Sequence, residues 1–251
     1  MKSAFFEKNK ILINTITDSP TTSTSNKNKL VDTMRFNKYM GNSEVSSIDF
    51  YLSEEVDSIA ILNSNLKTFQ IKFQNSDLSE TTIFSISNSN KRHFFIEFSK
   101  QKPTKITINI TATHTGAPPA IGYLFASSKI GDVEIFDGKI KVKPNTQSLT
   151  NQTADGKIWS TVLSPSTTFE IEGKIKTEQN IFTTIYENYV MQGQVVQYIH
   201  HYGTPIDDFR GIMEQVTFSN NFEFGENYMN NDGFYTGFHT IKGALLPSGG
   251  T

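Results

Sequence analysis

The chain has 251 residues, no cysteine and a formal net charge of −2 at pH 7. Its length suffices for one large β-domain or for two of ordinary size, and we predict two. The lack of cysteine excludes disulfides, thiolate catalysis and cysteine-bound zinc, and scattered Lys and Arg residues with a pI near 6.2 argue against a nucleic-acid-binding surface.

The composition and the first residues set further expectations. Twenty Phe and nine Tyr against one Trp favour β-structure, because aromatic side chains suit pleated surfaces. The apolar patch at residues 3–6 is interrupted by Glu7, Lys8 and Lys10 before it reaches the length of a secretory signal. No run reaches the ~18 apolar residues of a membrane span. We therefore expect a chain that is made in a cytoplasm and stays soluble or assembles there.

The first half of the chain predicts a series of antiparallel strands. Residues 10–16 predict a first strand, the Ser/Thr/Asn-rich residues 17–27 a loop or mobile arm, and residues 30–39 an irregular connection. In residues 45–74, Ile48, Phe50 and Leu52 alternate with polar neighbours, as in a strand with one buried face. Further strands are predicted at 81–86, 93–98, 105–112 and 120–126. Strands at intervals of about ten residues with turns between them favour a sandwich or jelly roll.

The pattern changes near residues 131–137, where we place a domain boundary. Short strands are predicted at 140–143, 148–152, 157–162, 168–175, 195–200, 210–218, 222–228 and 234–245. Residues 178–191 predict the one helix, with Thr177 as its cap and Gly193 as its stop. The predicted fold is mainly all-β: a strand and flexible arm over 1–30, a jelly-roll sandwich over 31–136, a second β-rich domain with one helix over 137–246, and a flexible tail over 247–251.

Four segments in the first half carry a resemblance to a known family. They are residues 28–32 (NKLVD), 48–52 (IDFYL), 56–63 (VDSIAILN) followed by Asn65 and Leu66, and 120–125 (AIGYLF). In this order they resemble the galactose-binding-like, or discoidin-like, jelly-roll domains of bacteriophage tail and baseplate proteins. The resemblance covers roughly residues 10–135. Residues 32–37 lack the Gly, the second Asp and the Trp that many such domains carry, so we predict neither a calcium site nor any other metal site.

Titratable residues give little reason to predict an enzyme. His200 and His201 are followed by Asp207 and Asp208, but adjacent residues of a strand point to opposite faces. His93, His114 and His239 stand alone. Two carboxylate pairs could suggest a glycosidase site, but solvent exposure explains both better. Glu54/Glu55 fits a turn, and Glu170/Glu172 fits the solvent-exposed face of a strand. No nucleophile elbow, phosphate-binding loop or dinucleotide fingerprint occurs, so we predict no catalytic residue and no cofactor.

Two functions therefore stay open. The resemblance implies a structural, non-enzymatic component of a phage tail or tail-like particle. Such a protein would be located in the virion and assembled in the host bacterial cytoplasm. Its partners would be copies of itself and other tail proteins, in a ring, baseplate or adaptor. The alternative is a carbohydrate-binding module that recognises host-surface glycan. The rings predicted to contact glycan are Tyr39, Tyr51, Tyr123 and Trp159, because sugars stack on aromatic faces.

Overall fold

The computed structural model describes residues 2–32, 38–152, 158–190, 192, 196–202, 213–218, 228–229 and 234–245. The chain divides into two compact units, Met1–Ile130 with Ile199–Ile212, and Gly131–Tyr198 with Met213–Thr251. Both units are built mainly of strands, so the predicted all-β class is confirmed. The residue boundaries of the predicted domains stay a prediction. The predicted tail over 247–251 lies outside the described residues.

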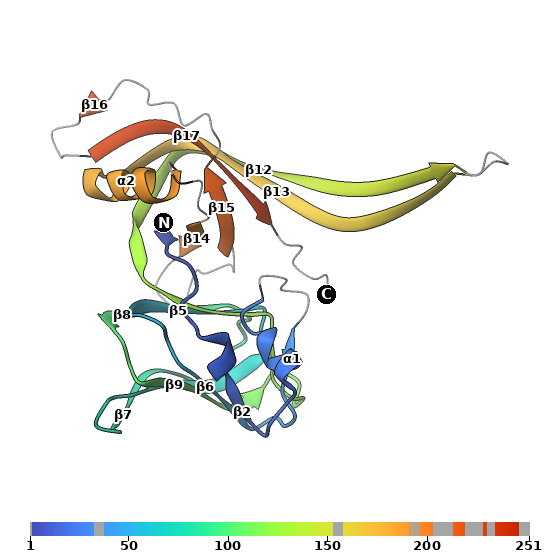
Figure 1. Ribbon diagram of the computed structural model, residues 1–251, viewed down its shortest axis with the longest axis vertical. Coiled ribbons are helices and arrows are strands. Elements are labelled where there is room, and N and C mark those ends of the chain that lie inside the picture. The colour runs from blue at the N-terminus through green and yellow to red at the C-terminus, as the bar shows by residue number, and fades with distance from the viewer. Residues whose placement is uncertain are drawn as a thin grey trace. The chain divides into compact units, whose positions relative to one another are not determined.

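The first unit contains an antiparallel sheet of five strands, which Figure 1 shows on its lower side. In spatial order the strands are β2 (Thr17–Ser19), β4 (Ser46–Phe50), β9 (Lys105–Thr113), β6 (Leu66–Gln74) and β7 (Glu80–Ile86). The pairing aligns Ile48 of β4 with Ile108 of β9, and Ile108 with Ile71 of β6. All three are buried, because paired residues share a face of the sheet. The alternation of apolar and polar residues along these strands therefore determines which face of the sheet is buried.

A second antiparallel sheet packs against that buried face. It consists of β11 (Tyr123–Ser127), β5 (Val56–Leu62) and β8 (Phe94–Gln101). Aromatic pairs join the two sheets: the Phe69 and Phe94 ring centroids lie 4.8 Å apart in an edge-to-face arrangement, and those of Phe73 and Phe98 lie 5.0 Å apart. Side chains of both sheets form one hydrophobic core, as expected for a sandwich.

The segments before β4 differ from their prediction. Residues 10–16 form no strand: Ile11 makes a single antiparallel bridge to Leu52, and a 3-10 helix (Ile13–Thr15) follows. The segment expected to be a loop or arm contains β2 and a short helix, α1 (Thr24–Asn28), whose first turn is capped when the Asn26 N–H donates to Ser23 Oγ. The remaining elements are β1 (Lys2–Phe6) and the pair β3 (Tyr39–Met40) and β10 (Ala120–Ile121).

In the described part of the second unit, two long strands take the place of the four short strands predicted over residues 140–175. Strands β12 (Lys129–Gln152) and β13 (Ile158–Glu178) form one hairpin in which Pro144 pairs with Thr167 and Pro165 with Thr146. Both prolines fall in the gaps between the predicted short strands, at residues 144–147 and 163–167, yet a two-stranded segment has edges on which proline is tolerated. β13 also pairs with β17 (Phe234–Leu245), which pairs with β15 (Met213–Phe218) and β16 (Tyr228–Met229).

The predicted helix is confirmed near its expected limits. It consists of α2 (Gln179–Ile185), which continues as a π-helical turn (Tyr186–Val190). β14 (Val196–Tyr202) follows. Among the described residues, no helix is long and apolar enough to cross a membrane.

Candidate functional site

The five-stranded sheet has one face turned away from the core, which we call the outer face. On β4, Ile48 and Phe50 are buried, so Ser47, Asp49 and the following Tyr51 lie on the outer face. On β9 the outer residues are Lys105, Thr107 and Asn109. The same alternation that builds the core therefore also sets polar side chains and one aromatic ring together on the opposite side.

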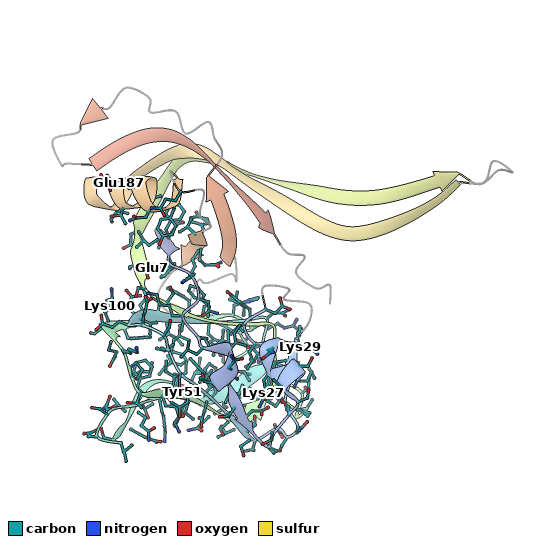
Figure 2. All side chains as sticks on the ribbon, viewed as in Figure 1. Glu7, Lys27, Lys29, Tyr51, Lys100 and Glu187 are labelled. Atoms are coloured by element: carbon teal, nitrogen blue, oxygen red, sulfur yellow. The ribbon has the colours of Figure 1, made fainter. Side chains whose placement is uncertain are left out.

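Tyr51 is the aromatic ring of this face. Its side chain is 40% exposed, and Figure 2 labels it on the first unit. Its backbone is held on both sides: the Tyr51 N–H donates to Thr15 Oγ1 over 3.2 Å, and the Tyr51 carbonyl accepts from the Leu12 N–H over 3.0 Å. Thr15 Oγ1 in turn donates to the Leu12 carbonyl. The short 3-10 helix thus fixes the point from which the Tyr51 ring projects.

Asp49 is the charged centre of the outer face. Thr107 Oγ1 donates to Asp49 Oδ1 over 2.7 Å, and Lys105 Nζ lies 3.4 Å from Asp49 Oδ2. The Asp49 side chain is 28% exposed and that of Lys105 is 22% exposed. A carboxylate oxygen has more than one lone pair, so Asp49 keeps acceptor capacity for a ligand after these two contacts. A carboxylate, a hydroxyl and an ammonium group beside an exposed ring suit a ligand that carries both hydroxyl groups and an apolar face.

Two of the four aromatic residues predicted to contact glycan are buried. Tyr39 is fully buried, and its hydroxyl donates to Asp18 Oδ2 over 2.8 Å. Burial, and then this hydrogen bond, raise the pKa of Tyr39. Tyr123 is 2% exposed, with its ring centroid 6.3 Å from that of Phe125. Neither of these two rings can stack on a sugar from solvent, which corrects the prediction for Tyr39 and Tyr123.

The other two aromatic residues predicted to contact glycan are Tyr51 and Trp159. Tyr51 is exposed on the outer face, as described above. The backbone of Trp159 belongs to β13, opposite Asn151, and its side chain lies outside the described residues.

The sequence did not predict Asp49, Lys105 and Thr107 as site residues. Alternation alone marks them as outward-facing, but the register between β4 and β9, 58 residues apart for Asp49 and Thr107, brings them together.

The histidines of the first half serve local structure. His93 Nδ1 accepts from the Asn63 N–H over 3.1 Å, and His114 Nε2 lies 3.3 Å from the Lys91 carbonyl oxygen. His200 and His201 belong to β14 and His239 to β17, while Asp207 and Asp208 lie outside the described residues. In the part of the chain that the structure describes, no group of three or more His, Cys, Asp or Glu residues is placed to hold a metal ion.

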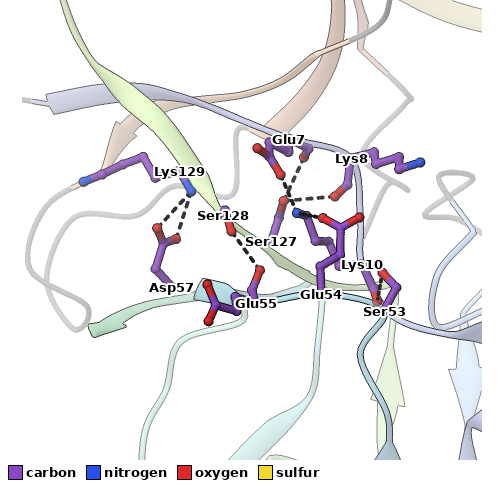
Figure 3. Close-up of polar contacts among 10 residues, drawn as sticks. All are labelled: Glu7, Lys8, Lys10, Ser53, Glu54, Glu55, Asp57, Ser127, Ser128 and Lys129. Carbon is purple, nitrogen blue, oxygen red and sulfur yellow. Dashed lines mark hydrogen bonds and ion pairs between the residues drawn. The ribbon is translucent and has the colours of Figure 1, made fainter. Parts of the chain in front are cut away.

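A second polar cluster lies where the amino-terminal segment meets the end of β11 (Figure 3). Lys10 is buried and forms ion pairs with Glu7 and Glu54. Burial alone would lower the pKa of Lys10, but the hydrogen bonds to Glu54 and Glu7 and the negative charges of these two carboxylates together outweigh burial and raise it. The same Lys10 hydrogen bond lowers the pKa of Glu54.

Backbone contacts in the same cluster tie the segment in place. Ser127 Oγ donates to the carbonyls of Glu7 and Lys8, and Ser128 Oγ donates to the carbonyl of Glu55. Asp57 accepts from the Lys129 N–H over 2.9 Å and 3.1 Å. The carboxylate of Glu54 and the backbone of Glu55 thus join segments of the fold. Of the other predicted carboxylate pair, Glu170 and Glu172 of β13 pair with Lys141 and Lys139 in the backbone register.

Comparisons with known proteins give no family. No family model and no curated protein matches the chain. Solved structures do match. They include chitosan-binding module 1 from a chitosanase/glucanase of Paenibacillus sp. IK-5, at 12% identity, covering 48% of this chain and 99% of the module, with a TM-score of 0.42. A family 32 carbohydrate-binding module from Streptococcus pneumoniae EndoD matches at 14% identity, 37% and 76% coverage and a TM-score of 0.32.

A pectin-binding carbohydrate-binding module matches at 16% identity, over 47% of this chain and 91% of the module, with a TM-score of 0.37. Against these findings, the predicted role in a phage tail is wrong: the neighbours are carbohydrate-binding modules, and nothing in them indicates a tail or baseplate protein. Phage proteins and further copies of the chain are likewise unsupported as partners. Identities this low and TM-scores below 0.5 leave the chain's own function to be argued from its residues.

Proposed function

We propose that the first unit binds carbohydrate through the outer face of its five-stranded sheet. The observation that carries the proposal is the exposed Tyr51 ring on the same face as the Asp49 carboxylate, which is held by Thr107 and Lys105. A pyranose ring presents an apolar C–H surface and a rim of hydroxyl groups. Tyr51 offers a platform for the apolar surface, and Asp49 accepts hydrogen bonds from the hydroxyls.

Hydrogen bonds to charged groups would supply much of the selectivity. A hydroxyl bound to a carboxylate or an ammonium group makes a shorter and stronger hydrogen bond than one bound to a neutral partner. Asp49 accepts and Lys105 donates, so a pair of neighbouring hydroxyls meets both an acceptor and a donor on this face. The Thr107 contact orients the Asp49 carboxylate before the ligand arrives, which reduces the ordering cost of binding.

The arrangement supports binding rather than glycoside hydrolysis. Hydrolysis by a carboxyl pair needs two carboxyl groups roughly 5–9.5 Å apart across the scissile bond. On the outer face, the described carboxylate beyond Asp49 is that of Glu80 on β7, and β9 and β6 lie between β4 and β7. Three strand spacings amount to about 14 Å. Asp49 therefore fits the role of a hydrogen-bond acceptor for a bound sugar.

A glycan array with the purified full-length chain tests the proposal. We expect retention of at least one class of glycan, and a loss of roughly tenfold or more in affinity for Tyr51→Ala, because one stacked ring contributes on the order of 1–3 kcal/mol. Val45→Ala is the matched control, since Val45 is 61% exposed at the other end of β4. The proposal fails if no glycan is retained, or if Tyr51→Ala binds as the wild type does.

A further inference from the structure

The outer face carries a row of polar residues that crosses the whole five-stranded sheet. In the register of the sheet, Thr17 pairs with Asp49, Asp49 with Thr107, Thr107 with Lys72, and Lys72 with Thr82. We call this set the cross-strand row. Neighbouring strands lie about 4.8 Å apart, so the row extends over about 19 Å. All five of its side chains are exposed or partly exposed.

The row is longer than one sugar. A single pyranose ring stacked on Tyr51 reaches Asp49 and its two partners, but it cannot reach Lys72 or Thr82, which lie two and three strands from β4. The repeat of an extended chain of hexopyranose rings is close to the spacing between strands. A chain that lies across the strands therefore meets a hydrogen-bonding side chain about once per sugar unit.

The charges of this face select against an acidic chain. Lys105 Nζ lies 3.4 Å from Asp49 Oδ2, and Lys72 Nζ lies 3.1 Å from Glu80 Oε2. Each of these cations already has its own carboxylate. A uronate or sulfate group would compete with that carboxylate for the ammonium group and would be repelled by it. Sugar hydroxyls, in contrast, can bind to the ammonium group and the carboxylate of one pair together.

From these two observations we propose that the ligand of the outer face is a neutral oligosaccharide segment of about four units, bound along the cross-strand row with one ring on Tyr51. This inference rests on the proposed function, because it specifies the ligand of the same face. Binding then depends on chain length: affinity rises with each added unit until the chain reaches Thr82, and an isolated monosaccharide binds weakly.

Affinity electrophoresis of the full-length chain provides the first test. The gels contain neutral polysaccharides (galactomannan, xyloglucan and hydroxyethylcellulose) or acidic ones (polygalacturonate, alginate and hyaluronate). We expect retardation by at least one neutral polymer and none by the acidic polymers at physiological salt. Retardation by acidic polymers alone would overturn the neutral assignment while leaving carbohydrate binding intact. No retardation in any gel, together with an empty glycan array, would instead overturn the proposed function itself.

Calorimetry with oligomers of the retarding neutral polymer provides the second test. We expect affinity to rise roughly tenfold from two units to four and to level off beyond that. Thr82→Ala should weaken binding of the tetramer roughly three- to tenfold, the effect of one hydrogen bond, and leave the dimer unaffected. Thr81→Ala is the matched control, because Thr81 is exposed on the same strand but pairs with the buried Phe73.

Two results would contradict the dependence of binding on chain length and leave the proposed carbohydrate binding unaffected. One is equal affinity for the monosaccharide and the tetramer, with Tyr51→Ala still abolishing both. The other is an identical tetramer affinity for Thr82→Ala and Thr81→Ala. Thermal unfolding should confirm that both variants are folded, because both side chains are exposed.

Discussion

The Tyr39 hydroxyl donates a hydrogen bond of 2.8 Å to Asp18 Oδ2 inside the first unit, and both side chains are buried. The other carboxylate oxygen, Oδ1, accepts from the Thr22 N–H over 3.0 Å. The pair joins β2 to β3 through two residues that lie 21 positions apart in the chain. Tyr39, which we expected to contact a ligand, is thus part of the framework on which the outer face is built.

Tyr39→Phe should destabilise the first unit by about 1.5–3 kcal/mol, because it removes the hydroxyl donor from a buried carboxylate. Urea unfolding monitored by circular dichroism measures the change. Tyr51→Phe is the matched control: its side chain is 40% exposed, and we expect a change within about 0.5 kcal/mol. Equal effects of the two substitutions would show that the Tyr39 hydrogen bond adds nothing to stability.

The same pair predicts a loss of stability at alkaline pH. The pKa of Tyr39 is raised in the folded chain by burial and by Asp18, so the folded state holds the phenol proton more tightly than the unfolded state. This contribution is fully present below the unfolded pKa of about 10 and is lost as pH rises above that value. The difference in unfolding free energy between wild type and Tyr39→Phe should therefore shrink above pH ~10. A difference that stays constant with pH would contradict the assignment.

The core between the two sheets should be sensitive to loss of a ring. Phe69 is fully buried, and its ring meets that of Phe94 edge to face at 4.8 Å. Phe69→Ala should cost about 3–5 kcal/mol, because the substitution removes transfer free energy and leaves a cavity between the sheets. Leu78→Ala, at a side chain that is 71% exposed, should change stability little. Thermal unfolding of both variants gives the comparison.

Much of the first unit could be predicted from the sequence because its strands have one buried face. The alternation in residues 105–112 predicts β9, and that around Ile48 and Phe50 predicts β4. The candidate site could not be read in the same way. Asp49 and Thr107 meet through pairing between distant strands, and a pattern within one strand carries no information about that register.

The burial of Tyr39, which was predicted to contact glycan, has a physical reason. A tyrosine can be buried when its hydroxyl finds a partner, and Asp18 supplies that partner for Tyr39. The residue type alone therefore does not separate a buried tyrosine from an exposed one. In the second unit, the long hairpin of β12 and β13 was predicted as four shorter strands, with Pro144 and Pro165 in the gaps, although both prolines sit in paired strands.

The buried Lys10 predicts an asymmetry between two substitutions. Lys10→Met keeps the length of the side chain and releases Glu7 and Glu54, which are 39% and 60% exposed and can be hydrated by water. The double substitution Glu7→Gln and Glu54→Gln instead leaves a buried ammonium group without its carboxylates. We expect the double variant to be the less stable of the two in urea unfolding at neutral pH. The opposite order would show that Lys10 is hydrated in solution.

The Asp49–Thr107 contact predicts an effect on binding without a matching effect on folding. Thr107→Val preserves the shape and the β-branching of the side chain but removes the hydroxyl that donates to Asp49 Oδ1. Lys105 still lies beside Oδ2, and the carboxylate is 28% exposed, so we expect the unfolding free energy to change by less than about 1 kcal/mol. The Asp49 carboxylate loses its fixed orientation, however, and affinity for the retained glycan should fall roughly three- to tenfold.

Asn109→Ala is the matched control for this effect, because Asn109 lies on the outer face of the same strand, opposite Ser47 and Gln70, and outside the cross-strand row. Calorimetric titration of the glycan measures both variants alongside the wild type. If Thr107→Val and Asn109→Ala bound with the same affinity, orientation of Asp49 by Thr107 would have no part in recognition. A larger loss for Thr107→Val ties recognition to the geometry of this one carboxylate, since charge and fold are unchanged in that variant.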